Sequence, residues 1–148
     1  MILVDVNLLL YATVASAPEH AAMRPWFTAR LNGSAAVGLP WSVLMSFVRI
    51  VANRRVYTQP VPVVEAWREV ERWLDCPCVW IPQPMERHRQ ILGSLLAQVA
   101  YRPSLVSDAH LAALAIEHGL TLCSADGDFA RFRGLRWENP LTEETPRK

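Results

Sequence analysis

Apolar residues in this chain form two kinds of pattern that alternate along its length. Short, continuous apolar runs rich in β-branched or aliphatic residues are typical of buried strands. The first run, residues 2–6, is the clearest example. Further strands are predicted at residues 35–39, at residues 79–81, at the start of the stretch LTLCSAD (residues 120–126) and at residues 135–137.

Between these runs, apolar residues recur every three or four positions, which predicts amphipathic helices. The predicted helical segments are residues 7–14, 18–31, 41–53, 61–74, 85–100 and 107–119. We expect Ser107 to cap the last of these helices and Gly119 to end it. Strands that alternate with helices predict an α/β domain with a mostly parallel sheet.

Length and composition are those of one globular domain. The 148 residues suffice for a substantial core, and 51% of them are hydrophobic. We expect the domain to span residues 1–140, followed by a polar tail at residues 141–148. The net charge of +1 argues against a polybasic nucleic-acid binder, although a local basic groove stays open.

Two features predict a cytoplasmic protein without a membrane anchor. Cys76, Cys78 and Cys123 lack the spacing of a zinc site or a C-x-x-C redox pair, so we expect thiols in a reducing compartment. Residues 8–17 are apolar, but Asp5 stands where a signal peptide carries basic residues. No apolar run is long enough to cross a membrane.

Asp5 interrupts the apolar opening stretch MILVDVNLLLYA. A buried charge without compensation costs several kcal/mol, so something should compensate for this one. Asp126 and Asp128 follow a predicted strand, and Asp108 lies in the first turn of a predicted helix, where negative charge is favoured. In open parallel sheets, sites form beyond the carboxyl ends of the strands. We therefore expect these four carboxylates to converge.

Convergence would need a counterion, because two carboxylates about 4 Å apart repel by roughly 4 kcal/mol at an effective dielectric near 20. Protonation or a divalent cation relieves this repulsion. Oxygen ligands suit Mg²⁺ or Mn²⁺ rather than zinc, and such an ion can activate water against a phosphodiester. Taken singly, Asp108 fits a helix start and Asp126 and Asp128 fit turns. Glu117 should point away from the cluster and pair with an Arg.

The helix predicted at residues 41–53 carries a polar stripe on an otherwise apolar surface. Ser42, Ser46, Arg49 and Asn53 make up this stripe, which indicates either a cleft or a solvated face. Arg49, Arg54 and Arg55 are candidate contacts to RNA phosphates, or simply soluble surface. Trp41 begins this helix beside the expected cleft, and we assign no histidine as a general base.

The stretches LVDVNLLLYA and SDAHLAALAIEHGLTLCSADGDFARF, with the α/β pattern between them, resemble a PIN domain. More narrowly, they resemble the toxin nuclease of a VapBC-type toxin–antitoxin pair, over nearly the whole chain. The resemblance implies a three-layer α/β/α fold and a Mg²⁺- or Mn²⁺-dependent endoribonuclease that cuts structured RNA such as tRNA or rRNA. It also implies metal-binding roles for Asp5, Asp108 and Asp126, a catalytic role for Asp128 beside them, and a supporting role for Asn7.

One position departs from the family pattern, because Ser46 stands where the family often has a Glu. A serine cannot replace an anionic ligand at full strength, so the affinity for metal and the number of metals are in question. The resemblance further implies a small VapB-type antitoxin, whose Arg would enter between the carboxylates, and a homodimer. Without metal or antitoxin, we expect Asp5 to be poorly paired.

Two other functions stay open at this point. The first is a non-catalytic RNA-binding or partner-binding module of the same fold, which the loss of the Glu at Ser46 would favour. The second is an aspartate-phosphorylating α/β protein, which also gathers acids at strand ends. That class needs a supporting lysine at a strand end, and the only lysine here is Lys148.

Overall fold

The computed structural model describes residues 1–142, and the expected tail falls almost entirely outside them. The strands are β1 (Ile2–Val4), β2 (Val37–Gly38), β3 (Val79–Trp80), β4 (Thr121–Cys123) and β5 (Trp137–Glu138). The helices are α1 (Val6–Thr13), α2 (His20–Leu31), α3 (Trp41–Val51), α4 (Val63–Leu74), α5 (His88–Gln98) and α6 (Val106–Glu117). Two 3₁₀ turns, η1 (Pro103–Leu105) and η2 (Gly127–Arg131), flank α6 and β4.

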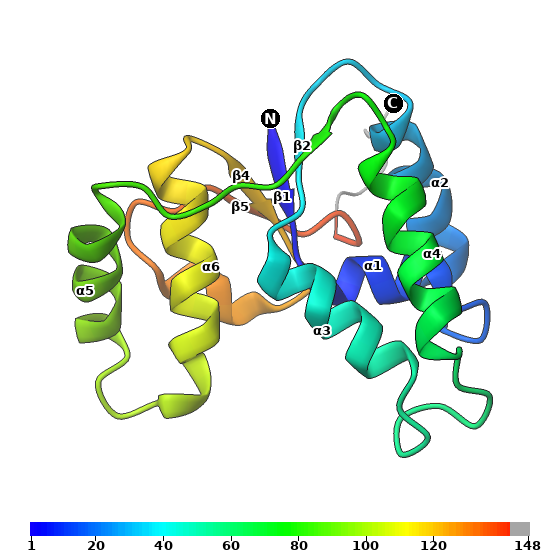
Figure 1. The fold of residues 1–148 in the computed structure, drawn as a ribbon. Helices are drawn as coiled ribbons and strands as arrows, with labels where there is room; N and C mark the ends of the chain where they lie inside the picture. Colours follow the sequence, from blue (N-terminus) through cyan, green and yellow to red (C-terminus); the bar gives the residue numbers. More distant parts are fainter. Residues whose placement is uncertain (143–148) are drawn as a thin grey trace, which may run out of the picture.

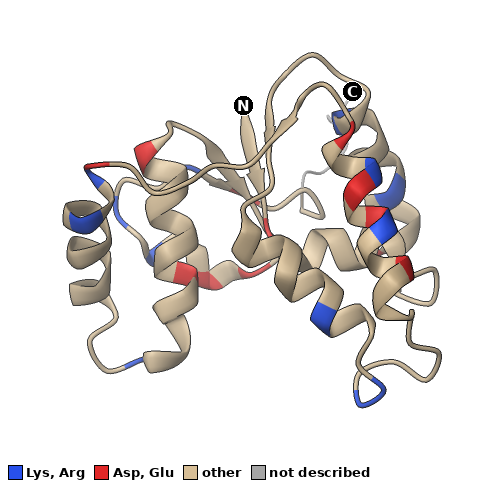
Figure 2. Cartoon of the chain, in the orientation of Figure 1, with Lys and Arg blue, Asp and Glu red and all other residues tan. Residues whose placement is uncertain are grey.

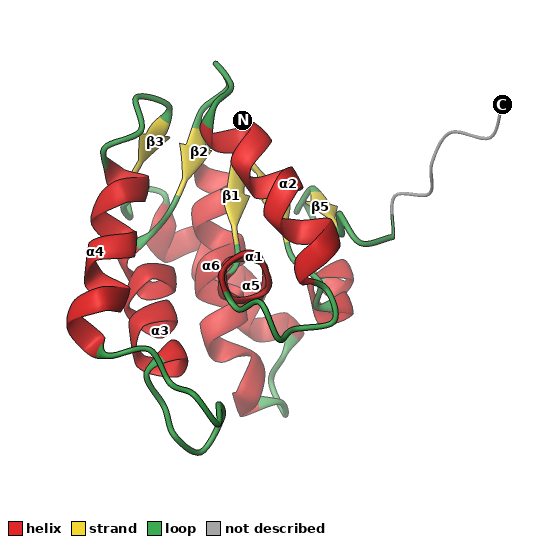
Figure 3. Cartoon of the chain, turned by 90° about the vertical axis from the view of Figure 1, so that its right-hand side faces the viewer, coloured by secondary structure: helices red, strands yellow, loops and turns green. Residues whose placement is uncertain are grey.

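The five strands form one sheet in the order β3-β2-β1-β4-β5, and every neighbouring pair is parallel. Helices cover both faces (Figure 1): α5 and α6 lie on one side of the sheet, and α1 to α4 lie on the other. Figure 3 shows the strands enclosed between these helical layers. The predicted three-layer α/β/α architecture with a parallel sheet is confirmed.

The strand order places a switch point beside β1. The chain moves from β1 outward to β2 and β3, and then returns across the sheet to β4 on the other side of β1. In open parallel sheets, ligands bind beyond the carboxyl ends of the strands where the strand order reverses. Asp5 directly follows β1 and Ser124 directly follows β4, so both residues lie at this point.

The core lies between the sheet and its helices. Leu3, Val4 and Leu122 of the two central strands are fully buried. On α6, the buried alanines Ala109, Ala112, Ala113 and Ala115 present little side-chain bulk, which allows this helix to pack closely on its neighbours. No helix among residues 1–142 has the length and apolar character needed to cross a membrane.

The first boundary that differs from the sequence prediction lies at Asp5. Strand β1 ends at Val4, because Asp5 caps α1 by accepting a hydrogen bond from the Val6 backbone N–H. The second lies at α6, which begins at Val106 directly after η1, so Ser107 lies in the first turn and does not cap the helix. Gly119 does end α6, as predicted, with a φ of 67° that favours glycine.

Candidate active site

Asp5 is the most deeply buried carboxylate at the switch point, with 8% of its surface exposed. Its Oδ1 accepts a hydrogen bond from the Val6 N–H at 2.7 Å, and its Oδ2 accepts from Ser124 Oγ at 2.7 Å and from Asn7 Nδ2 at 3.2 Å. The expectation that Asp5 is poorly paired is therefore wrong for hydrogen bonds. No ion pair in residues 1–142 includes it, however.

Burial raises the pKa of the Asp5 carboxyl above its usual value, although the hydrogen bonds from Ser124 and Val6 oppose the shift. The negative charge of Asp126 raises this pKa further. Desolvation is thus only partly compensated by the three donors. The ionised Asp5 carboxylate would gain from a nearby cation.

Ser124 is a residue of this site that sequence reasoning missed. Its fully buried hydroxyl donates to Asp5 and accepts from Asn7 Nδ2 at 3.0 Å and from the Asp126 N–H at 3.0 Å. Asn7 completes the network, since its Oδ1 accepts from the Ala125 N–H at 3.3 Å. These contacts tie the end of β1 to the loop after β4, and a supporting role of Asn7 in catalysis stays a prediction. The position of Ser124 directly after a buried strand could have indicated it.

Asp108 faces the same space as Asp5 across the end of the sheet. Both line a pocket of about 120 Å³ whose wall also includes Ser42 and Ser46 of α3 and Ser107 of α6. Burial raises the pKa of the half-buried Asp108 to about 6, and the charges of Asp5, Asp126 and Asp128 contribute to the shift. The structure therefore brings together Asp5, Asp108 and Ser46.

Asp126 and Asp128 lie near this pocket but do not line it. Asp126 caps η2, and its Oδ1 accepts a hydrogen bond from the Asp128 N–H at 2.9 Å. The carboxylate of Asp128 pairs with Arg131 at 2.8 Å and lies 3.8 Å from Arg102. Asp128 is thus already paired with arginine, which makes it a weaker candidate ligand than Asp126.

The donors around the pocket suit a hard cation. Its wall presents carboxylate and hydroxyl oxygens and no histidine or cysteine. Nowhere in the described chain do three His, Cys, Asp or Glu side chains lie close enough together to hold one metal ion. Mg²⁺ is commonly held by one or two carboxylates and keeps several waters, so the pair Asp5 and Asp108 fits such an ion. Ser46 adds a neutral oxygen and no charge.

The arginine of α3 and the serines of α3 that line the acidic pocket lie toward opposite ends of this helix. Ser42 and Ser46 of the predicted polar stripe line the pocket, whereas Arg49 is exposed and does not. Arg54 and Arg55 are exposed in the turn after α3. Acidic segments gather where β1 and β4 end, while α3 and its following turn carry only basic charge (Figure 2). An RNA role for these arginines stays a prediction.

A larger pocket of the described chain lies elsewhere, and no acidic or basic side chain lines it. It has a volume of about 480 Å³ and is lined by the ends of α1 and α3 and the turns after them, including Thr13, Val51 and Tyr57. No carboxylate, histidine or arginine lines it. The smaller acidic pocket is therefore the better candidate for phosphodiester chemistry.

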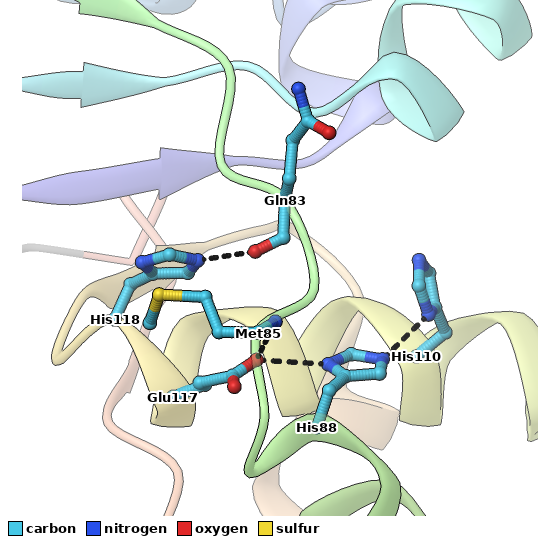
Figure 4. Close-up of polar contacts among 6 residues, drawn as sticks. All are labelled: Gln83, Met85, His88, His110, Glu117 and His118. Atoms are coloured by element: carbon cyan, nitrogen blue, oxygen red, sulfur yellow. Dashed lines mark hydrogen bonds and ion pairs between the residues drawn. The ribbon is translucent and has the colours of Figure 1, made fainter.

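Glu117 does point away from the acidic cluster, but its partner is not an arginine. Its side chain is 1% exposed, and its Oε2 accepts from the Met85 N–H at 3.1 Å and lies 3.2 Å from His88 Nδ1 (Figure 4). An ionised carboxylate only accepts, so His88 donates here, and its Nε2 lies 3.1 Å from His110 Nδ1. The four groups join the start of α5 and the segment before it to α6, which carries Asp108.

Replacing Glu117 with Ala should lower the free energy of unfolding by about 3 kcal/mol, because the Met85 amide and the imidazole of His88 would lose their buried acceptor. Urea denaturation measures this loss. The exposed neighbour Glu86 provides the control, and its change to Ala should cost less than about 0.5 kcal/mol. Equal losses in the two variants would contradict a structural role for Glu117.

Comparisons with known proteins find similar sequences and similar folds. The PIN domain family model matches residues 2–135. The chain is 43% identical over 145 residues to the VapC ribonuclease Mb2897 of Mycobacterium bovis, covering 98% of this chain and 99% of that protein.

Two solved structures share the fold. VapBC2 of Rickettsia felis, bound to a DNA fragment from its promoter, has a TM-score of 0.68 at 17% identity and covers 94% of this chain and 98% of its own. VapC20 of Mycobacterium tuberculosis, a sarcin–ricin loop cleaving toxin, has a TM-score of 0.65 at 17% identity and covers 92% and 99%.

Proposed function

This chain is a PIN-domain protein of the VapC ribonuclease family, and on that premise we propose that it hydrolyses RNA phosphodiesters as the toxin of a toxin–antitoxin pair. The observation that carries the proposal is the shared pocket of Asp5 and Asp108 at the switch point of the sheet. Burial raises the pKa values of both carboxyls, and the charge of Asp126 at Asp5 and that of Asp5 at Asp108 raise them further, so the pocket has a demand for positive charge.

In the proposed mechanism, Asp5 and Asp108 would hold a Mg²⁺ or Mn²⁺ ion, with Asp126 as a further candidate ligand. A bound ion of this kind supplies activation of water and neutralisation of charge at the phosphate. Ser124 and Asn7 fix the orientation of Asp5 by hydrogen bonds, so this carboxylate is preorganised before substrate arrives. Ser46 could hold a water by hydrogen bonding, because this residue lines the same pocket.

The same pocket suits a guanidinium group, so we propose that a VapB-type antitoxin inserts an Arg between Asp5 and Asp108. An antitoxin partner is supported by the relationship to VapC proteins and by the VapBC assembly among the structures of the same fold. Formation of a homodimer and a cytoplasmic location stay predictions.

The test is incubation of the purified, antitoxin-free chain with total RNA in Mg²⁺, in Mn²⁺ and in EDTA. We expect discrete cleavage products with either ion and intact RNA in EDTA. Intact RNA under all three conditions, from protein shown by circular dichroism to be folded, would overturn the nuclease proposal. That result would favour a non-catalytic RNA-binding module, for which the missing carboxylate at Ser46 is the specific structural argument.

A further inference from the structure

An aromatic pair stands beside the acidic pocket. Trp41 is the first residue of α3, and the next residue, Ser42, lines the pocket with Asp5 and Asp108. The indole of Trp41 lies nearly parallel to that of Trp67 on α4, with ring centroids 6.4 Å apart and an interplanar angle of 13°. Trp41 nevertheless stays 43% exposed. The pair therefore holds a large aromatic surface in a fixed orientation at the solvent boundary.

The exposed row on α3 leads from this aromatic surface to positive charge. Residues four apart share one side of a helix, so Trp41, Met45 and Arg49 form a row with about 6 Å of helix between neighbours. All three residues are exposed. The adjacent row holds Ser42 and Ser46, which line the acidic pocket. A ligand lying along the exposed row would therefore lie next to the two serines that share a pocket with Asp5 and Asp108.

Charge along this part of the chain favours a polyanion. From residue 41 to residue 64 the sequence contains three arginines, Arg49, Arg54 and Arg55, and no Asp or Glu. Figure 2 shows the same asymmetry, with basic segments on α3 and its following turn and acidic segments at the strand ends. Arginine contacts phosphates without reading sequence, and an aromatic face stacks any unpaired base.

We propose that Trp41, supported from behind by Trp67, is a stacking platform for an unpaired base of the RNA substrate next to the scissile phosphate, with Arg49 on a neighbouring phosphate. This inference rests on the proposed ribonuclease function and specifies its substrate as RNA that is single-stranded at the cut. A second copy of this chain suits the row less well than a polyanion, because its net charge is +1 and the row carries only positive charge.

Binding tests the proposal separately from cleavage. All variants carry Asp5→Asn, and binding of a fluorescent single-stranded oligoribonucleotide and of its duplex is measured by anisotropy in EDTA. We expect Trp41→Ala to weaken single-strand binding roughly 10-fold or more and to leave duplex binding within about 3-fold. Trp41→Phe keeps an aromatic face and should recover most of the affinity. The control is Tyr101→Ala, which removes a ring that is 97% exposed on another element.

Unchanged single-strand binding by a folded Trp41→Ala variant would overturn the proposed stacking role of Trp41. An equal loss of single-strand affinity in Tyr101→Ala would also overturn it. If the protein is a dimer and Trp41→Ala makes it monomeric in sedimentation while RNA binding is unchanged, the row on α3 is a contact between copies. That result would also overturn the proposed stacking role of Trp41. If RNA binding depends on Trp41 but no RNA is cut in Mg²⁺ or in Mn²⁺, the stacking role of Trp41 is supported and only the nuclease proposal is refuted.

Discussion

Replacing Asp5 with Asn should abolish metal-dependent RNA cleavage, with a loss of about 10³-fold or more, while the metal-free protein stays as stable as the original. A loss of that size corresponds to about 4 kcal/mol of transition-state stabilisation. Activity falls because the neutral amide is a much weaker ligand for a divalent cation than a carboxylate. Stability is kept because the amide oxygen still accepts from the Val6 N–H, and because the burial that raises the pKa of the Asp5 carboxyl no longer opposes a charge.

Cleavage rates in Mg²⁺ and thermal unfolding in EDTA are the two measurements. Asp75→Asn is the matched control, because Asp75 is exposed at the end of α4, outside the pocket that holds Asp5 and Asp108. This control should retain both full activity and full stability. A melting temperature of Asp5→Asn that falls by more than about 5 °C would show that the hydrogen bonds to ionised Asp5 outweigh its desolvation.

Replacing Asp108 with Asn should remove cleavage as well and should also change how stability depends on pH. The pKa of Asp108 is raised from 3.8 to about 6, so the folded state binds its proton more tightly than the unfolded chain. The stability from that proton is fully present below about pH 4 and is lost as the pH rises through 6. The shift corresponds to about 3 kcal/mol, which solvent screening of this half-exposed side chain reduces to about 1 kcal/mol.

Urea denaturation at pH 4 and pH 7 in EDTA measures this effect as a difference between variant and original. We expect Asp108→Asn to be more stable than the original at pH 7 by about 1 kcal/mol and to lose less stability between pH 4 and pH 7. The stability of the variant should still depend on pH, because the pKa of Asp5 is also raised. Adding Mg²⁺ at pH 7 should stabilise the original more than the variant. Identical pH profiles for the two proteins would contradict electrostatic strain at Asp108.

The hydrophobic pattern was sufficient to predict the elements and their class. Every strand and helix of the described chain overlaps a predicted segment, because periodicity reflects which side of an element is buried. The ends were less predictable at Asp5 and Ser107. Asp and Ser both favour the first cap position of a helix. Whether a given residue takes that position depends on where the segment before the helix ends, which is β1 for Asp5 and η1 for Ser107.

The site was predictable in part for the same reason. Asp5 and Asp108 could be selected because a carboxylate at the end of an apolar strand or at a helix start needs compensation, and a parallel sheet brings strand ends together. The sequence could not show that Ser124 joins Asp5 to Asn7, or that arginines engage Asp128. Nor could it show that Glu117 meets His88, since these two residues lie on different helices.

The sequence by itself determined the fold class, the edge of the sheet that carries acid, and the family, because each depends on local pattern and spacing. Tertiary structure alone decided which acids share a pocket, which are neutralised elsewhere, and that Trp41 stacks on Trp67 beside that pocket. The physical reason is the range of the interactions. Burial, hydrogen bonds and ion pairs act over a few ångströms, and only the packing of distant segments brings their partners within that range.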